Sequence, residues 1–172
     1  MGLPTDIDLS GNTLLVKEVK TGYSQPNQVS TSRQTTAAGS TLTVTRTTHL
    51  GRTILLDTLT GSVVTLPAAA GTGDVYHFAV SVAPTSNNHI IKVANASDTM
   101  VGGVITITGT TAAGVMGDFA SGTDDTLTMN GTTTGGGIGA YFDVIDLATN
   151  VWLVRGQSFA SGTVATMFSA TV

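Results

Sequence analysis

Hydrophobic and polar residues alternate with a period of two along most of the chain, and helical periodicity is nearly absent. Alternation places successive side chains on opposite faces of an extended strand, and Val, Ile, Thr and aromatic residues favour strands. The pattern predicts strands at residues 14–19, 41–46, 52–56, 63–66, 75–82, 90–94, 104–108, 126–129, 140–146 and 151–155. Their short lengths, with Gly, Asn and Pro between them, predict an all-β, sandwich-like or jelly-roll-like fold.

The same alternation assigns faces to two of these strands. In VYHFAVSV it places Tyr76, Phe78, Val80 and Val82 on one side, which we expect to be core. Trp152 shares a face with its apolar neighbour two residues on, so we expect it in the core as well; the alternative is an exposed platform for carbohydrate. DVIDLATNVWLVRG predicts a hairpin, because the Asn in its centre tolerates positive φ.

The first 40 residues differ in composition from the rest of the chain. Residues 21–40 are polar and rich in Ser and Gln, which predicts a linker, and the short apolar stretch TLLVKEV precedes them. We therefore expect residues 1–39 to be an extended N-terminal arm and linker, and residues 40–172 to be a single β-sandwich-like domain. An isolated strand is unstable, so the arm would pair with a neighbouring subunit or within its own domain. The candidate assembly contacts are Leu14, Leu15, Val16, Val19 and Tyr23.

Charge is scarce in this sequence. Charged residues make up 10% of the chain, against about 25% in an ordinary domain, and Thr, Ser and Asn supply most polar positions. Such a surface is typical of a protein packed against copies of itself or a larger assembly. The net charge of −4 and scattered basic residues argue against a nucleic-acid partner. No segment reaches about 18 apolar residues and no signal peptide is evident, so no membrane partner is expected.

Two segments resemble ligand-binding loops. LPAAAGTGDVYHFAV has paired glycines, but a phosphate loop needs a lysine and a following helix, whereas Asp74 and a strand follow here, so we predict a turn. In DIDLSGNTLLVKE, Asp6 and Asp8 have the spacing of a calcium loop, but Lys17 stands where that loop needs a glutamate. We predict an Asx-rich turn there.

The sequence gives little support for catalysis or for a metal site. His49, His77 and His89 lie on separate segments without zinc-type spacing, and the chain has no cysteine. Asp143 and Asp146 are candidates for glycan hydrolysis, but three residues apart on a strand they point to opposite faces. We therefore expect a protein that is not an enzyme and has no cofactor or metal.

A resemblance to a known class runs from about residue 40 to the end. TLTVTRTTHLGRTILLD, VTLPAAAGTGDVYHFAV, HIIKVANASDTMVGGVITI and TLTMNGTTTGGGIGAYFDVIDLATNVWLVRG resemble segments of small virion proteins of tailed bacteriophages, especially those that decorate or cement the head. The resemblance implies a non-enzymatic protein, made in the host cytoplasm, that assembles on the outer capsid surface. It implies homo-oligomers, often trimers, that clamp neighbouring major capsid protein subunits. The alternative is a tail-fibre or receptor-binding module that recognises a host surface glycan.

Overall fold

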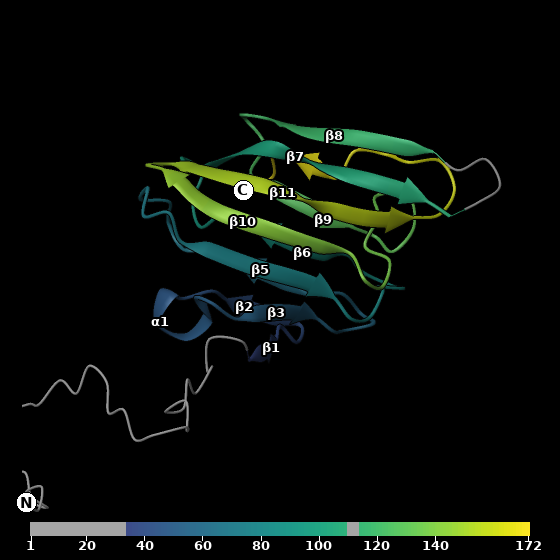
Figure 1. Ribbon diagram of the computed structural model, residues 1–172, viewed down its shortest axis with the longest axis horizontal. Helices are drawn as coiled ribbons and strands as arrows, with labels where there is room; N and C mark the ends of the chain where they lie inside the picture. Colours follow the sequence, from purple (N-terminus) through teal and green to yellow (C-terminus); the bar gives the residue numbers. More distant parts are fainter. Residues whose placement is uncertain (1–33, 110–113) are drawn as a thin grey trace, which may run out of the picture. The chain divides into compact units, whose positions relative to one another are not determined.

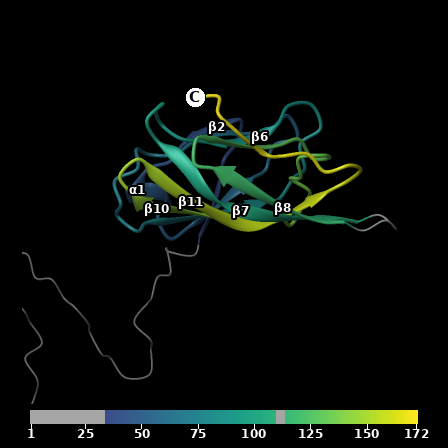
Figure 2. The same cartoon turned by 90° about the horizontal axis from the view of Figure 1, so that it is seen from above.

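The computed structural model describes residues 34–109 and 114–172, and this part of the chain is nearly all β. The strands form a seven-stranded sheet, in the order β1-β3-β5-β10-β11-β7-β8, and a five-stranded sheet, in the order β12-β9-β6-β4-β2. We call them the large and the small sheet. In Figure 1 the large sheet runs from β8 at the top to β1 at the bottom, and Figure 2 shows the two layers from above. The predicted all-β, sandwich-like fold is confirmed.

Every strand predicted from residue 41 onward has an observed counterpart. The strands of the large sheet are β1 (Thr35–Ala37), β3 (Thr53–Leu56), β5 (Val75–Val80), β10 (Tyr141–Ala148), β11 (Val151–Ala160), β7 (Thr99–Thr108) and β8 (Val115–Ser121). Those of the small sheet are β12 (Phe168–Ser169), β9 (Thr126–Met129), β6 (His89–Lys92), β4 (Val63–Thr65) and β2 (Thr41–Thr43). One short helix, α1 (Arg46–His49), follows β2.

The first half of this domain winds between the two sheets as a parallel coil. β1, β3 and β5 pair in parallel in the large sheet, and β2, β4 and β6 pair in parallel in the small sheet. Parallel neighbours need a crossover connection, and here each crossover contains a strand of the opposite sheet. The second half adds the antiparallel pairs β10–β11 and β7–β8, and β7 joins β11 in parallel.

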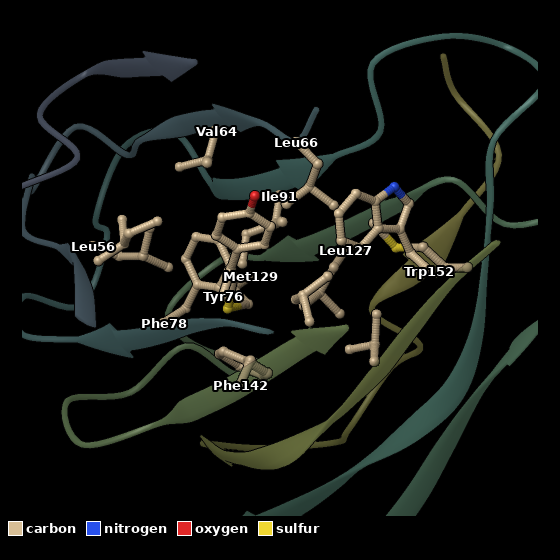
Figure 3. Close-up of a cluster of buried hydrophobic side chains, with 14 of the residues drawn as sticks. Leu56, Val64, Leu66, Tyr76, Phe78, Ile91, Leu127, Met129, Phe142 and Trp152 are labelled. Carbon is tan, nitrogen blue, oxygen red and sulfur yellow. The ribbon is translucent and has the colours of Figure 1, made fainter. Parts of the chain in front are cut away.

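The core lies between the sheets. Figure 3 shows large aromatic side chains of the large sheet, among them Tyr76, Phe78 and Trp152, facing aliphatic side chains of the small sheet. The rings of Tyr76 and Trp152 are tilted by 56°, with their centroids 6.0 Å apart. Tyr76, Phe78 and Val80 are buried as predicted, whereas Val82 lies beyond the end of β5 and is partly exposed. Trp152 is fully buried, so its prediction as core is confirmed and the carbohydrate-platform alternative is wrong.

Four local predictions need correction. Thr35–Ala37 is strand β1 and not linker, since it pairs with β3 despite its polar sequence. Arg46 begins helix α1 and does not extend β2. β7 begins at Thr99 and not at residue 104. Its two glycines interrupt the hydrophobic pattern but do not end the strand. β8 is absent from the predicted strands, because its glycines interrupt the alternating pattern.

The predicted N-terminal strand lies outside the described residues. This holds for the assembly-contact candidates Leu14, Leu15, Val16, Val19 and Tyr23, and for the calcium-loop-like segment.

Candidate functional site

The outer face of the large sheet carries a group of exposed apolar side chains. Along β7, β8 and β10 the residues that point away from the core include Ile105, Val115, Phe119 and Tyr141, with exposed fractions of 52%, 71%, 76% and 51%. Isolated exposed hydrophobic residues are ordinary on protein surfaces. These four share one face of adjoining strands, so they form a surface, which we call the outer face.

The strand registers bring the outer-face residues side by side. Tyr141 pairs with Gln157, which pairs with Ile105, which pairs with Gly117. In the next row Phe119 pairs with Gly103. The row order explains how side chains from three distant segments meet on one surface.

Gly103 allows the ring of Phe119 to lie on the sheet. A Cβ atom built on Gly103 would lie 2.9 Å from a carbon of this ring, and one built on Gly117 would lie 3.6 Å from it. Glycine inside a strand often marks such a close approach. The ring therefore covers backbone on one side and presents its other side outward.

A polar cluster occupies the middle of the same face. His77, Asp143 and Arg155 are direct neighbours on β5, β10 and β11. Asp143 Oδ1 lies 2.7 Å from His77 Nδ1, and Arg155 Nε and Nη2 each lie 3.1 Å from Asp143 Oδ2. The guanidinium of Arg155 offsets the carboxylate, so the cluster interrupts the apolar surface without adding a net negative charge. Exposed pairs of this kind contribute about 0–1 kcal/mol each.

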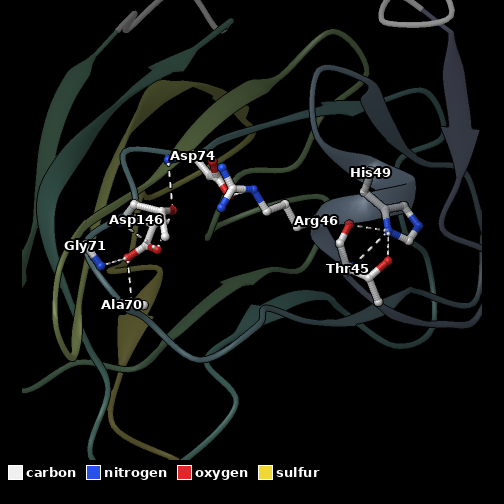
Figure 4. A network of polar contacts seen from close by, with 8 residues as sticks. Thr45, Arg46, His49, Ala70, Gly71, Asp74 and Asp146 are labelled. Atoms are coloured by element: carbon white, nitrogen blue, oxygen red, sulfur yellow. Dashed lines mark hydrogen bonds and ion pairs between the residues drawn. The ribbon is translucent and has the colours of Figure 1, made fainter. Parts of the chain in front are cut away.

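The glycine-rich loop before β5 binds a carboxylate group of the protein itself, the side chain of Asp146. The backbone N–H groups of Ala70 and Gly71 donate to Asp146 Oδ1 at 2.9 and 2.7 Å, and Thr72 donates to Oδ2 through its N–H and its hydroxyl at 3.1 and 2.8 Å (Figure 4). Burial alone would raise the pKa of Asp146, but these hydrogen bonds hold the pKa below its ordinary value. Convergent backbone N–H groups are a known form of anion site.

The loop is also the predicted turn between strands. Gly71 and Gly73 both have a φ of 75°, which favours glycine, and the chain then enters β5. Arg46 of α1 forms an ion pair with Asp74, with 3.0 Å between Arg46 Nε and Asp74 Oδ2, as Figure 4 shows. The sequence does not reveal the hydrogen bonds to Asp146, because their donors lie 74 to 76 residues away from it.

The histidines lie in three separate places. His49 accepts the Thr45 N–H at its Nδ1, at 2.9 Å. His89 is fully buried: its Nδ1 accepts the Ser62 N–H at 3.0 Å, and its Nε2 lies 2.8 Å from the Val82 carbonyl oxygen. Burial lowers the pKa of His89, which matches a neutral ring with Nε2 as donor.

The two candidate catalytic aspartates are not brought together. Asp143 faces outward and Asp146 is buried on the other face of β10, as the spacing predicts. Within residues 34–109 and 114–172, no group of three or more His, Cys, Asp or Glu residues could hold a metal ion. In the same residues, no helix has the length and apolar character needed to cross a membrane.

No family model matches the chain, and the comparisons with curated proteins and with solved structures give no match.

Proposed function

We propose that this protein is a non-enzymatic structural component of a tailed-bacteriophage virion. In this proposal it decorates the outside of the capsid, binds the major capsid protein and stabilises contacts between its subunits. The observation that carries the proposal is the outer face, with Ile105, Val115, Phe119 and Tyr141 at least half exposed on one sheet. Exposed apolar patches of this kind mark protein interaction surfaces.

The shape of the surface favours a protein partner over a small molecule. Small-molecule sites are usually concave, with a few polar groups that converge on the ligand. The outer face is instead a sheet surface, and its ionic groups are already paired with one another. At the start of β8 lies a hollow of about 420 Å³, and the described residues that line it are Thr, Gly, Val and Met, without a titratable side chain.

The scarcity of charge also supports an assembly role. A protein repeated many times on a shell gains strength from many contacts of moderate area, because neighbouring contacts raise the effective concentration of one another. The arm residues Leu14–Tyr23 would supply a second contact to the shell or to a neighbouring copy. Binding to the outside of the shell requires no attraction to the genome, in keeping with the net charge of −4.

Co-sedimentation with capsids tests this proposal. The double variant Ile105→Ser, Phe119→Ser removes apolar area from the outer face while leaving the core intact, and it should weaken capsid binding at least tenfold. Leu59→Ser is the matched control, because Leu59 is 58% exposed but lies in the loop between β3 and β4. Unchanged binding by the double variant would contradict a role for the outer face.

Imaging of labelled protein on virions tests the location. Uniform label on the head is the expected result. Label confined to the tail would favour the receptor-binding alternative. Trp152 could not be the glycan-binding residue in that case, because it is fully buried.

A further inference from the structure

Strand β8 leaves one edge of the large sheet open. It is the last strand of that sheet and pairs only with β7 among the described strands. β8 has seven residues, whereas the other terminal strands, β1, β2 and β12, have three, three and two. An open strand edge is a template for pairing with another chain, and a long edge is the stronger template.

β8 lacks three of the features that usually protect an edge: basic residues, proline and a bulge. Its sequence, VMGDFAS, contains no lysine, arginine or proline. Its register with β7 is continuous from Val101↔Ser121 to Ile107↔Val115, without a bulge. Its one charged residue, Asp118, is turned inward, where it accepts hydrogen bonds from the Thr166 hydroxyl and the Met167 N–H.

The hydrogen-bond pattern shows which backbone groups point outward. Thr108 N–H donates to the Gly114 carbonyl at 3.0 Å, so these two residues face each other as a bonded pair. Bonded and non-bonded pairs alternate along antiparallel strands. Met116, Asp118 and Ala120 therefore bond to β7, and the backbone groups of Val115, Gly117 and Phe119 point to the open edge.

We propose that β8 pairs with β8 of a second copy, antiparallel across a two-fold axis at Gly117. In this register Gly117 lies opposite Gly117 of the partner subunit, and Val115 lies opposite Phe119 of the partner subunit. The outward groups of Val115, Gly117 and Phe119 then form about six hydrogen bonds between the two strands. The large sheets of the two copies become one continuous sheet.

The side-chain sizes and charges of β8 favour a second β8 as the partner strand, in this register. On the outer face each large Phe119 meets the smaller Val115, and glycine meets glycine, so no two rings compete for the same space. Asp118 lies opposite Met116 of the partner subunit, which avoids the repulsion of two aspartates. An antiparallel pair of identical strands satisfies both copies at once.

This inference goes beyond the proposed function and does not depend on it, since the dimer forms without capsids. It differs from the trimer that the resemblance to decoration proteins implies.

Disulfide trapping tests the register directly, because the natural chain has no cysteine. Residues of a bonded pair have Cα atoms about 5.5 Å apart, which suits a disulfide. A mixture of Val115→Cys and Phe119→Cys proteins should cross-link under mild oxidation at least tenfold more than either protein alone. The Cα atoms of two copies of residue 115 would lie about 14 Å apart, too far to bridge.

A second pair of variants tests the edge without cysteine. Gly117→Pro removes an outward N–H but no bond to β7, so light scattering should show a monomer with an unchanged circular dichroism spectrum. Gly117→Ala keeps the N–H, and its Cβ would lie 3.6 Å from the Phe119 ring, an ordinary contact, so it should remain a dimer. A monomeric or trimeric natural protein, or equal cross-linking by Val115→Cys alone, would overturn the inference.

Discussion

At the scale of single residues, Asp146 is the most consequential polar side chain in the described part of the chain. Its carboxylate accepts four hydrogen bonds from Ala70, Gly71 and Thr72 and so joins β10 to the loop before β5. Replacing it removes a charged acceptor that ties an exposed loop to the buried face of β10. Such losses are costly, because hydrogen bonds to a charged group contribute about 1.5–3 kcal/mol each.

We therefore expect Asp146→Ala to lower the free energy of unfolding by about 3 kcal/mol. Urea denaturation followed by tryptophan fluorescence measures this, since Trp152 is the sole tryptophan. Asp143→Ala is the matched control on the same strand, and its exposed cluster should contribute about 1 kcal/mol or less. Equal effects of the two substitutions would refute the role assigned to the loop.

The pH dependence of stability should have two steps. Burial lowers the pKa of His89 below 6.5, so the unfolded chain binds a proton more readily and stability falls as the pH drops from 6.5 through the folded pKa. For Asp146, burial opposes the hydrogen bonds, but the net effect is a pKa below 3.8. Its contribution is present above pH 3.8 and is lost as the pH falls through the folded pKa.

Thermal unfolding at a series of pH values measures both steps. His89→Gln should remove the upper step, whereas His77→Gln, at an exposed site, should retain it. An upper step that persists in His89→Gln would assign it to another group.

At the scale of elements, the alternation of residues predicts strands well and strand partners poorly. Val75–Val80 and Thr126–Met129 stand out in the sequence because side chains on one face are buried. The parallel pairing of β1 with β3 leaves no local signal, since the paired residues belong to different turns of the coil. β8 was missed because Gly117 and the neighbouring glycines interrupt the alternation that marks a strand.

Strand β1 sets the limit for N-terminal truncation. Removal of residues 1–33 leaves β1 intact and should give a folded domain with an unchanged melting temperature. Removal of residues 1–38 also deletes β1 and buried Ala38, uncovers the edge of β3, and should lower the melting temperature by several degrees. Differential scanning calorimetry compares the two, and identical melting temperatures would show that β1 adds nothing to stability.

At the scale of the whole molecule, the arm and the outer face make separable contributions to the proposed capsid binding. The protein without residues 1–33 keeps the outer face and loses the arm. If both contact the shell, this protein should bind capsids at least tenfold more weakly in co-sedimentation while its circular dichroism spectrum still shows a β-rich fold. Saturation of capsids with unchanged affinity would exclude the arm from the interface.

The parallel coil has a consequence for the rate at which the molecule folds. Neighbouring strands of the coil pair across 18 to 27 positions. Outside the coil, His77 of β5 meets Asp143 of β10 across 66 residues. Folds dominated by such pairings cross a high entropic barrier and fold in milliseconds to seconds or longer. Unfolding must break many of these pairings together, so a copy that has reached its native state should persist as a long-lived component of whatever it joins.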